Sequence, residues 1–202
     1  MAANRIMQGG GGVARLRRRS RRALLGAALV CALASTLAAC GGGGDSSSAA
    51  AAEAAADGEV LNQVLGRQEA AVIAYADALR GIGEPFLRIA RQFQAQEEEH
   101  VDATLKALRG VGALPEPEAE EIPRGRLRAR RDYLRFLYEL ESGTIEEESA
   151  AVAELASSAA RTTIAATIAN QAQHLVLLRR ALGAKPVETV PDAFENGTTP
   201  AP

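Results

Sequence analysis

The chain has 202 residues, of which 47% are hydrophobic and only 3% aromatic, and its formal net charge is −2. Alanine supplies much of the hydrophobic content, while β-branched and aromatic residues are sparse. This composition disfavours an all-β sandwich or barrel and favours an alanine-rich helical fold. The length allows one ordinary domain with appendages, and two cysteines are too few for a disulfide scaffold or a four-cysteine zinc site.

The first 40 residues are strongly basic. They contain seven arginines and no acidic residue, so residues 41–202 carry a net charge of −9. An arginine cluster followed by the apolar run 23–34 predicts an export signal. The apolar run is too short to serve comfortably as a permanent membrane span. The acidic character of the remainder argues against a nucleic-acid partner.

The end of the basic segment resembles a bacterial lipoprotein signal. Its residues Leu37-Ala38-Ala39-Cys40 resemble a lipobox, which implies that Cys40 is lipidated and becomes the first residue of the mature protein. The protein would then be exported and lipid-anchored on the outer face of a bacterial cytoplasmic membrane. The alternative is a plain signal peptide that ends in small residues. Residues 20–25 resemble a twin-arginine signal, and an arginine-rich general secretory signal is the competing interpretation of residues 1–40.

Beyond the signal, the sequence predicts a tether, four helices and a tail. Residues 41–58 are rich in Gly, Ser and Ala, for which we expect a flexible tether. Apolar residues at three-to-four spacing then predict helices over residues 59–80, 85–109, 126–156 and 161–182. The first and last connections are short, and the middle one is long. The pattern therefore predicts an all-α four-helix bundle over 59–183, with a long helix 2–helix 3 connection and an extended tail at 184–202.

Polar residues interrupt the apolar stripe of every predicted helix. They are Glu69 in the first helix, Glu97 and His100 in the second, Glu141 in the third, and Gln171 and His174 in the fourth. Burying an unpaired carboxylate costs several kcal/mol, so such residues usually have a partner or bind a metal. The two histidines are the only ones in the chain, and they occupy equivalent places in the two helical hairpins.

This constellation resembles the ferritin-like superfamily, specifically small single-chain proteins built as a duplicated helical hairpin. In that superfamily two helices each supply a Glu, and the other two each supply a Glu-x-x-His motif, around two metal ions. Glu97 and His100 match one such motif, and Glu69 and Glu141 match the lone glutamates. The resemblance implies that Fe or Mn is bound by these four residues together with His174. It also implies iron-oxidation or peroxide-linked redox activity.

The fourth helix departs from the family pattern, because Gln171 stands where the second motif has Glu. A Gln carbonyl oxygen is neutral, so Gln171 is expected to be a weak or vestigial ligand, and the site to hold one metal tightly or two weakly. Glu148 lies about 10 Å from Glu141 along the helix axis and is not expected to replace the missing carboxylate. The alternative function is a metal-free helical envelope lipoprotein, an interaction or stress-protection module with a hydrogen-bonded core.

Overall fold

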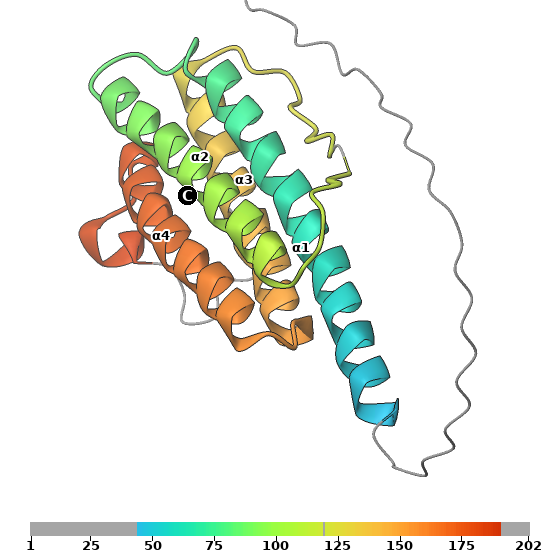
Figure 1. The fold of residues 1–202 in the computed structure, drawn as a ribbon. Coiled ribbons are helices and arrows are strands. Elements are labelled where there is room, and N and C mark those ends of the chain that lie inside the picture. Colours follow the sequence, from blue (N-terminus) through green and yellow to red (C-terminus); the bar gives the residue numbers. More distant parts are fainter. Residues whose placement is uncertain (1–43, 119, 191–202) are drawn as a thin grey trace, which may run out of the picture. The chain divides into compact units, whose positions relative to one another are not determined.

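We analysed a computed structural model of the chain, which describes residues 44–118 and 120–190. The described residues form four α-helices followed by a short 3-10 helix, η1. Figure 1 shows the α-helices packed side by side. These elements are α1 (Gly44–Ala78), α2 (Phe86–Gly110), α3 (Arg130–Glu154), α4 (Ser158–Leu182) and η1 (Pro186–Thr189). Helix α1 packs against α2 and α3, and α4 packs against the same two helices. The described residues contain no β-strand, so the predicted all-α four-helix bundle is confirmed.

Helix α1 begins well before the residue at which the sequence predicted a helix. It starts at Gly44, so the expectation of a flexible tether is wrong for residues 44–58. Seven of the eight residues in 49–56 are alanine, the residue with the highest helix propensity, which explains why this stretch continues the helix. Most of 47–56 is exposed, and this part of α1 extends beyond the ends of the other helices (Figure 1).

Asp57 lies at the level where α1 meets the α3–α4 turn. Its Oδ1 accepts a hydrogen bond from the backbone N–H of Ala156 at 2.7 Å, and its Oδ2 accepts one from that of Ser157 at 2.8 Å. These N–H groups immediately precede α4, where no carbonyl within the helix can accept them. The buried carboxylate of Asp57 therefore joins the first helix to the second hairpin.

We expect Asp57→Ala to lower the free energy of unfolding by about 1–3 kcal/mol, because it leaves two backbone donors without an acceptor. Urea unfolding followed by circular dichroism measures this change. Glu53→Ala is the matched control, because Glu53 lies one turn earlier on α1 and is exposed. Equal stability of the two variants would show that the Asp57 bonds contribute nothing.

The long connection between α2 and α3 runs back along α1 (Figure 1). Asn62 of α1 fixes its first part, since the Asn62 amide donates to the carbonyl of Leu114 and accepts from the N–H of Glu116. Gly66 then allows the backbone of the connection to lie close to the backbone of α1. A Cβ atom at this position would lie 2.3 Å from the backbone oxygen of Glu118.

Gly66→Ala should therefore destabilise the fold by about 1–3 kcal/mol, because backbone must move to make room for the methyl group. In an open helix position the same substitution stabilises by roughly 0.5–1 kcal/mol. Gly110→Ala is such a position, with nothing within 4 Å of the added Cβ. Opposite signs for the two variants in thermal unfolding are the expected result, and a stabilising Gly66→Ala would contradict the close approach.

The interior consists of two apolar clusters with a polar layer between them. One cluster contains Tyr75, Phe86, Phe93 and Leu178, and the other contains Leu61, Leu108, Leu155 and Ile164. The buried residues of the layer include Gln68, Glu97, His100, Thr104, Glu141, Glu148, Thr167, Gln171 and His174. The candidate functional residues therefore lie together in one polar segment of the core, about two helical turns long.

The export signal, Cys40 and residues 191–202 of the predicted tail lie outside the described residues. The part of the tail that is described is not fully extended, because Pro186–Thr189 form a 3-10 turn. The guanidinium of Arg179 donates to the carbonyl of Val190 at 2.9 Å and to the hydroxyl of Tyr138 at 2.9 Å, which holds this segment against the bundle. Within residues 44–118 and 120–190, no helix has both the length and the apolar character needed to span a membrane.

Candidate metal site

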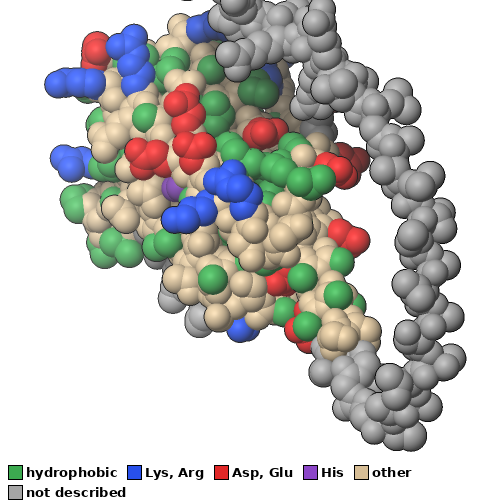
Figure 2. All heavy atoms as spheres, viewed as in Figure 1, with side chains coloured by type: hydrophobic (Ala, Val, Ile, Leu, Met, Phe, Trp, Pro, Cys, Tyr) green, Lys and Arg blue, Asp and Glu red, His purple; other side chains and the backbone are tan. Residues whose placement is uncertain are grey.

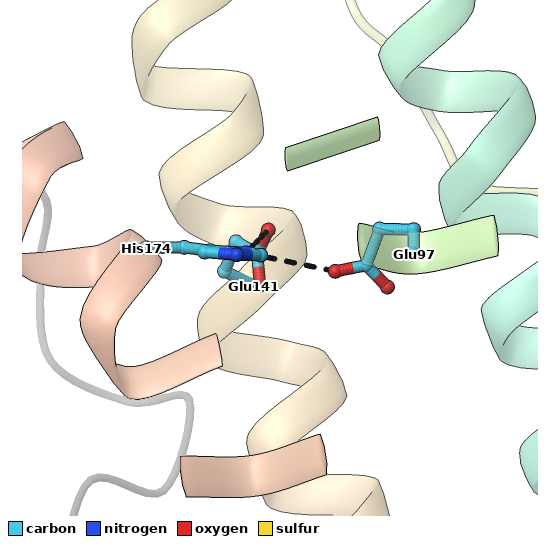
Figure 3. Close-up of side chains that lie close together, drawn as sticks. All are labelled: Glu97, Glu141 and His174. Carbon is cyan, nitrogen blue, oxygen red and sulfur yellow. Dashed lines mark hydrogen bonds and ion pairs between the residues drawn. The ribbon is translucent and has the colours of Figure 1, made fainter. Parts of the chain in front are cut away.

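Three side chains from three helices converge in the polar layer (Figure 3). They are Glu97 of α2, Glu141 of α3 and His174 of α4, and one ligand atom of each lies within 4.8 Å of the other two. His174 Nδ1 is 2.9 Å from Glu141 Oε1 and 3.6 Å from Glu97 Oε1. None of the three residues is more than 2% exposed. This set lies in the bundle core, where the sequence placed it.

The three- and four-residue spacing of buried positions directs these side chains inward. In α2 the buried positions are Phe86, Ala90, Phe93, Glu97, His100, Thr104 and Leu108. Helix α4 repeats the pattern with its own core residues and includes both Gln171 and His174. Phe93 packs face to face on His174, with ring centroids 3.9 Å apart, and thereby fixes the plane of the imidazole.

His100 lies beside the three converging residues rather than among them. Its Nδ1 is 3.3 Å from Glu97 Oε2, and its ring centroid is 6.5 Å from that of His174. The ring also lines a cavity of about 520 Å³ between α2 and α4. Figure 2 shows only a small patch of histidine on this face, in keeping with an exposed fraction of 7% for His100. His100 therefore connects the buried layer to an open groove.

The buried carboxylates of the polar layer are destabilised by loss of solvent and by their mutual repulsion. Burial, followed by the charge of Glu141, raises the pKa of the Glu97 carboxyl, although both histidines partly oppose this shift. Burial lowers the pKa of His100, but its hydrogen bond to Glu97 and the nearby carboxylates outweigh that effect, so the pKa is raised. A cation bound between these carboxylates would relieve the repulsion.

Tyr75 of α1 completes this part of the layer. It is fully buried, and its hydroxyl donates a short hydrogen bond to Glu141 Oε1. Burial, together with the charges of Glu141 and Glu97, raises the pKa of Tyr75 well above its ordinary value. Tyr75 therefore remains a protonated donor, and it positions Glu141. The sequence analysis missed this residue.

Gln96 orients His174 from the other side of the ring. Its Oε1 lies 2.9 Å from His174 Nε2, and a carbonyl oxygen can only accept, so the Nε2 atom carries a proton. The opposite atom, Nδ1, points toward the two carboxylates. Hydrogen bonding of the outer ring nitrogen is the usual way in which a metal-binding histidine is oriented. Gln96 was also missed, because it precedes the inward-facing Glu97 by one residue.

Three buried acceptor atoms in the layer have no hydrogen-bond donor among the described residues. They are Glu97 Oε1, Glu141 Oε2 and Gln171 Oε1. Unpaired buried acceptors are rare and unfavourable unless an ion or water satisfies them. Carboxylate and imidazole ligands suit Fe, Mn and Zn. The donor set therefore fits a divalent transition metal, as the sequence analysis expected for Glu97, Glu141 and His174.

The prediction that Glu69 is a ligand is wrong. Glu69 is exposed and borders a surface groove together with Ile73, whereas its neighbour Gln68 is fully buried in the polar layer. The sequence analysis assigned both Leu65 and Val72 to the inward-facing stripe, and Glu69 lies between them at helical spacing. Val72 is only half-buried, so it does not mark the inward face. The inward stripe instead runs through Leu65, Gln68 and Tyr75. The spacing of Gln68 from these two residues was a signal that the sequence already contained.

Glu148 is also buried, on the same face of α3 as Glu141. Its Oε1 accepts from Gln68 Nε2 at 2.7 Å, and its Oε2 accepts from Thr167 Oγ1 at 2.6 Å. Burial raises the pKa of this carboxyl to about 7, although both hydrogen bonds oppose the shift. Gln171 Nε2 lies 3.5 Å from Glu148 Oε1. Glu148 is thus part of the polar layer, but it does not belong to the converging group of three.

Comparisons with known proteins agree with the four-helix fold. Residues 46–184 match the family described as the ferritin-like domain. A conserved hypothetical protein from Mycobacterium tuberculosis has a similar structure, with a TM-score of 0.60, 18% identity, and coverage of 66% of this chain and 95% of that one. A ferritin-like, diiron-carboxylate protein from Bacillus anthracis str. Ames has a TM-score of 0.53 and 17% identity, with coverage of 65% and 98%. At these identities the likeness shows the fold alone. No curated protein matches the sequence.

Proposed function

This chain belongs to the ferritin-like domain family, and on that premise we propose that it binds iron, or Mn in its place, in the core of the bundle. Glu97, Glu141 and His174 would hold the ion, and His100 would support Glu97. The observation that carries the proposal is the convergence of these ligand atoms within 4.8 Å, with unpaired oxygen atoms on both carboxylates. The bound metal would supply Lewis acidity and redox chemistry.

We further propose that this metal supports weak iron oxidation or peroxide-linked redox work outside the cytoplasm. The groove beside His100 supports this part of the proposal, because it gives small molecules a route toward the layer. The lipobox-like sequence that ends at Cys40 supports a membrane tether. If the tether is correct, mass spectrometry of the mature protein will find a lipidated Cys40 at its N-terminus, and Cys40→Ala will release the protein from the membrane fraction.

The second candidate function is a metal-free envelope module. The observation that favours it is the hydrogen-bonded set around Glu148, in which Gln68 and Thr167 satisfy the carboxylate without a metal. In that case the whole polar layer would serve to specify the packing of the helices.

Iron binding by the purified protein distinguishes the two functions. After anaerobic addition of Fe(II) and desalting, we expect elemental analysis to find stoichiometric iron in the wild type. Glu141→Gln and His174→Ala should reduce it to background, because each removes one of three converging ligands. Glu146→Gln is the matched control, since Glu146 is an exposed acid on the same helix. Background iron in the wild type would leave the metal-free function as the conclusion.

A further inference from the structure

The two halves of the polar layer differ in the ligands that they offer, and this difference extends the proposed function, on which it rests. In one half, Glu141 of α3 and His174 of α4 converge with Glu97 of α2. In the other half, His100 of α2 is present, but α1 places Gln68 in the layer, and its acidic neighbour Glu69 is exposed. Only the first half therefore combines carboxylates with an imidazole around one point.

The other half is filled by hydrogen bonds between side chains of all four helices. Thr104 of α2 donates to Gln68 Oε1 at 2.8 Å, and Gln68 Nε2 donates to Glu148 Oε1. Thr167 of α4 donates to Glu148 Oε2 at 2.6 Å. Gln171 Nε2 approaches the same carboxylate at 3.5 Å. Both oxygens of Glu148 thus accept from neutral donors, and they could bind an ion only if this network were broken.

The charge available to a second ion is also insufficient. With Glu148 engaged, the remaining groups in this half are His100, the carbonyl oxygen of Gln171 and a share of Glu97. Glu97 Oε2 is already close to His100, while its Oε1 faces His174. Glu97 and Glu141 together carry two negative charges, which balance one divalent ion but not two, and neutral amide oxygens add no charge.

We infer that the core is built for one divalent transition-metal ion, held by Glu97 of α2, Glu141 of α3 and His174 of α4. The hydrogen-bond network around Glu148 occupies the neighbouring position and replaces a second ion. His100 is a positioning residue in this arrangement, because it holds Glu97 Oε2 and leaves Oε1 free for the metal.

Cobalt binding to the metal-free protein tests this inference. Anaerobic calorimetric titration with Co(II), checked by metal analysis after desalting, should give one equivalent in the wild type. His174→Ala should abolish Co(II) binding. His100→Ala should weaken binding by about 10–100-fold, the usual effect of losing a group that orients a ligand, without changing the stoichiometry. Glu148→Gln should retain one equivalent, because that carboxylate is not a ligand.

The double variant Gln68→Glu/Gln171→Glu tests whether the amides exclude a second ion. We expect it to bind two equivalents, and Gln171→Glu alone serves if circular dichroism shows that the double variant does not fold. Two equivalents in the wild type, or loss of binding in Glu148→Gln, would overturn the inference but preserve the proposed metal function. A folded double variant that still binds one ion would also overturn it. Absence of binding in the wild type would instead overturn the proposed function itself.

Discussion

Between pH 4.5 and pH 7 the metal-free protein should lose about 3 kcal/mol of unfolding free energy through Glu148 alone. The carboxyl has a pKa of about 7 in the folded protein and 4.5 as its ordinary value. In this interval the folded state therefore binds more protons than the unfolded state, and stability falls as the pH rises. The contribution is fully present below pH 4.5 and is lost as the pH rises through 7.

Glu148→Gln isolates this effect, because the amide cannot titrate. We expect the difference in stability between wild type and variant to change by the same amount between the two pH values, in urea unfolding with a chelator present. The raised pKa of Glu97 acts in the same direction, so the comparison with a single variant is essential. Glu146→Gln is the control at an exposed position, and its unfolding free energy should change with pH as that of the wild type does. A parallel Glu148→Gln profile would contradict a pKa near 7.

Arg67→Ala should destabilise the protein by about 1.5–3 kcal/mol, the usual cost of losing hydrogen bonds that involve a charged group. The guanidinium donates to Thr144 Oγ1 at 3.0 Å and to the carbonyl of Leu140. It also pairs with Glu120 of the long connection and with Glu147 of α3. Burial raises the pKa of Glu147 and Arg67 opposes that shift, so removing Arg67 takes away the cation beside this carboxylate.

Gly143 packs against this guanidinium, since a Cβ at residue 143 would lie 2.8 Å from the Arg67 Nη2 atom. Arg67→Lys should recover part of the lost stability, since one ammonium cannot reproduce the several directed bonds of the guanidinium. Arg91→Ala is the control at an exposed position of α2. Hydrogen exchange should also quicken around residue 120 in Arg67→Ala. Stability equal to that of Arg91→Ala would show that the network contributes nothing.

Local features of the sequence predicted the fold well, and the reason is physical. Helix periodicity and breakers depend on neighbouring residues, so α2 and α4 were found within a few residues of their observed limits. The same holds for Glu97, His100, Gln171 and His174, whose spacing within each helix placed them in the core. Helix α1 begins earlier than predicted, because residues 44–58 offer little to bury but are rich in alanine, which has the highest helix propensity.

The sequence by itself thus determined an all-α bundle, a duplicated hairpin and an inward-facing set of acids and histidines. Only the tertiary structure decided that Gln68 rather than Glu69 faces the core, and that Glu148 joins Gln68 and Thr167 rather than Glu141 and His174. Rotation about a helix axis by one residue turns a side chain by about 100°, and the weak apolar stripe of α1 leaves that rotation undetermined in the sequence. Packing against α2 and α3 sets the rotation of α1, and with it the number of metal ions for which the core provides ligands.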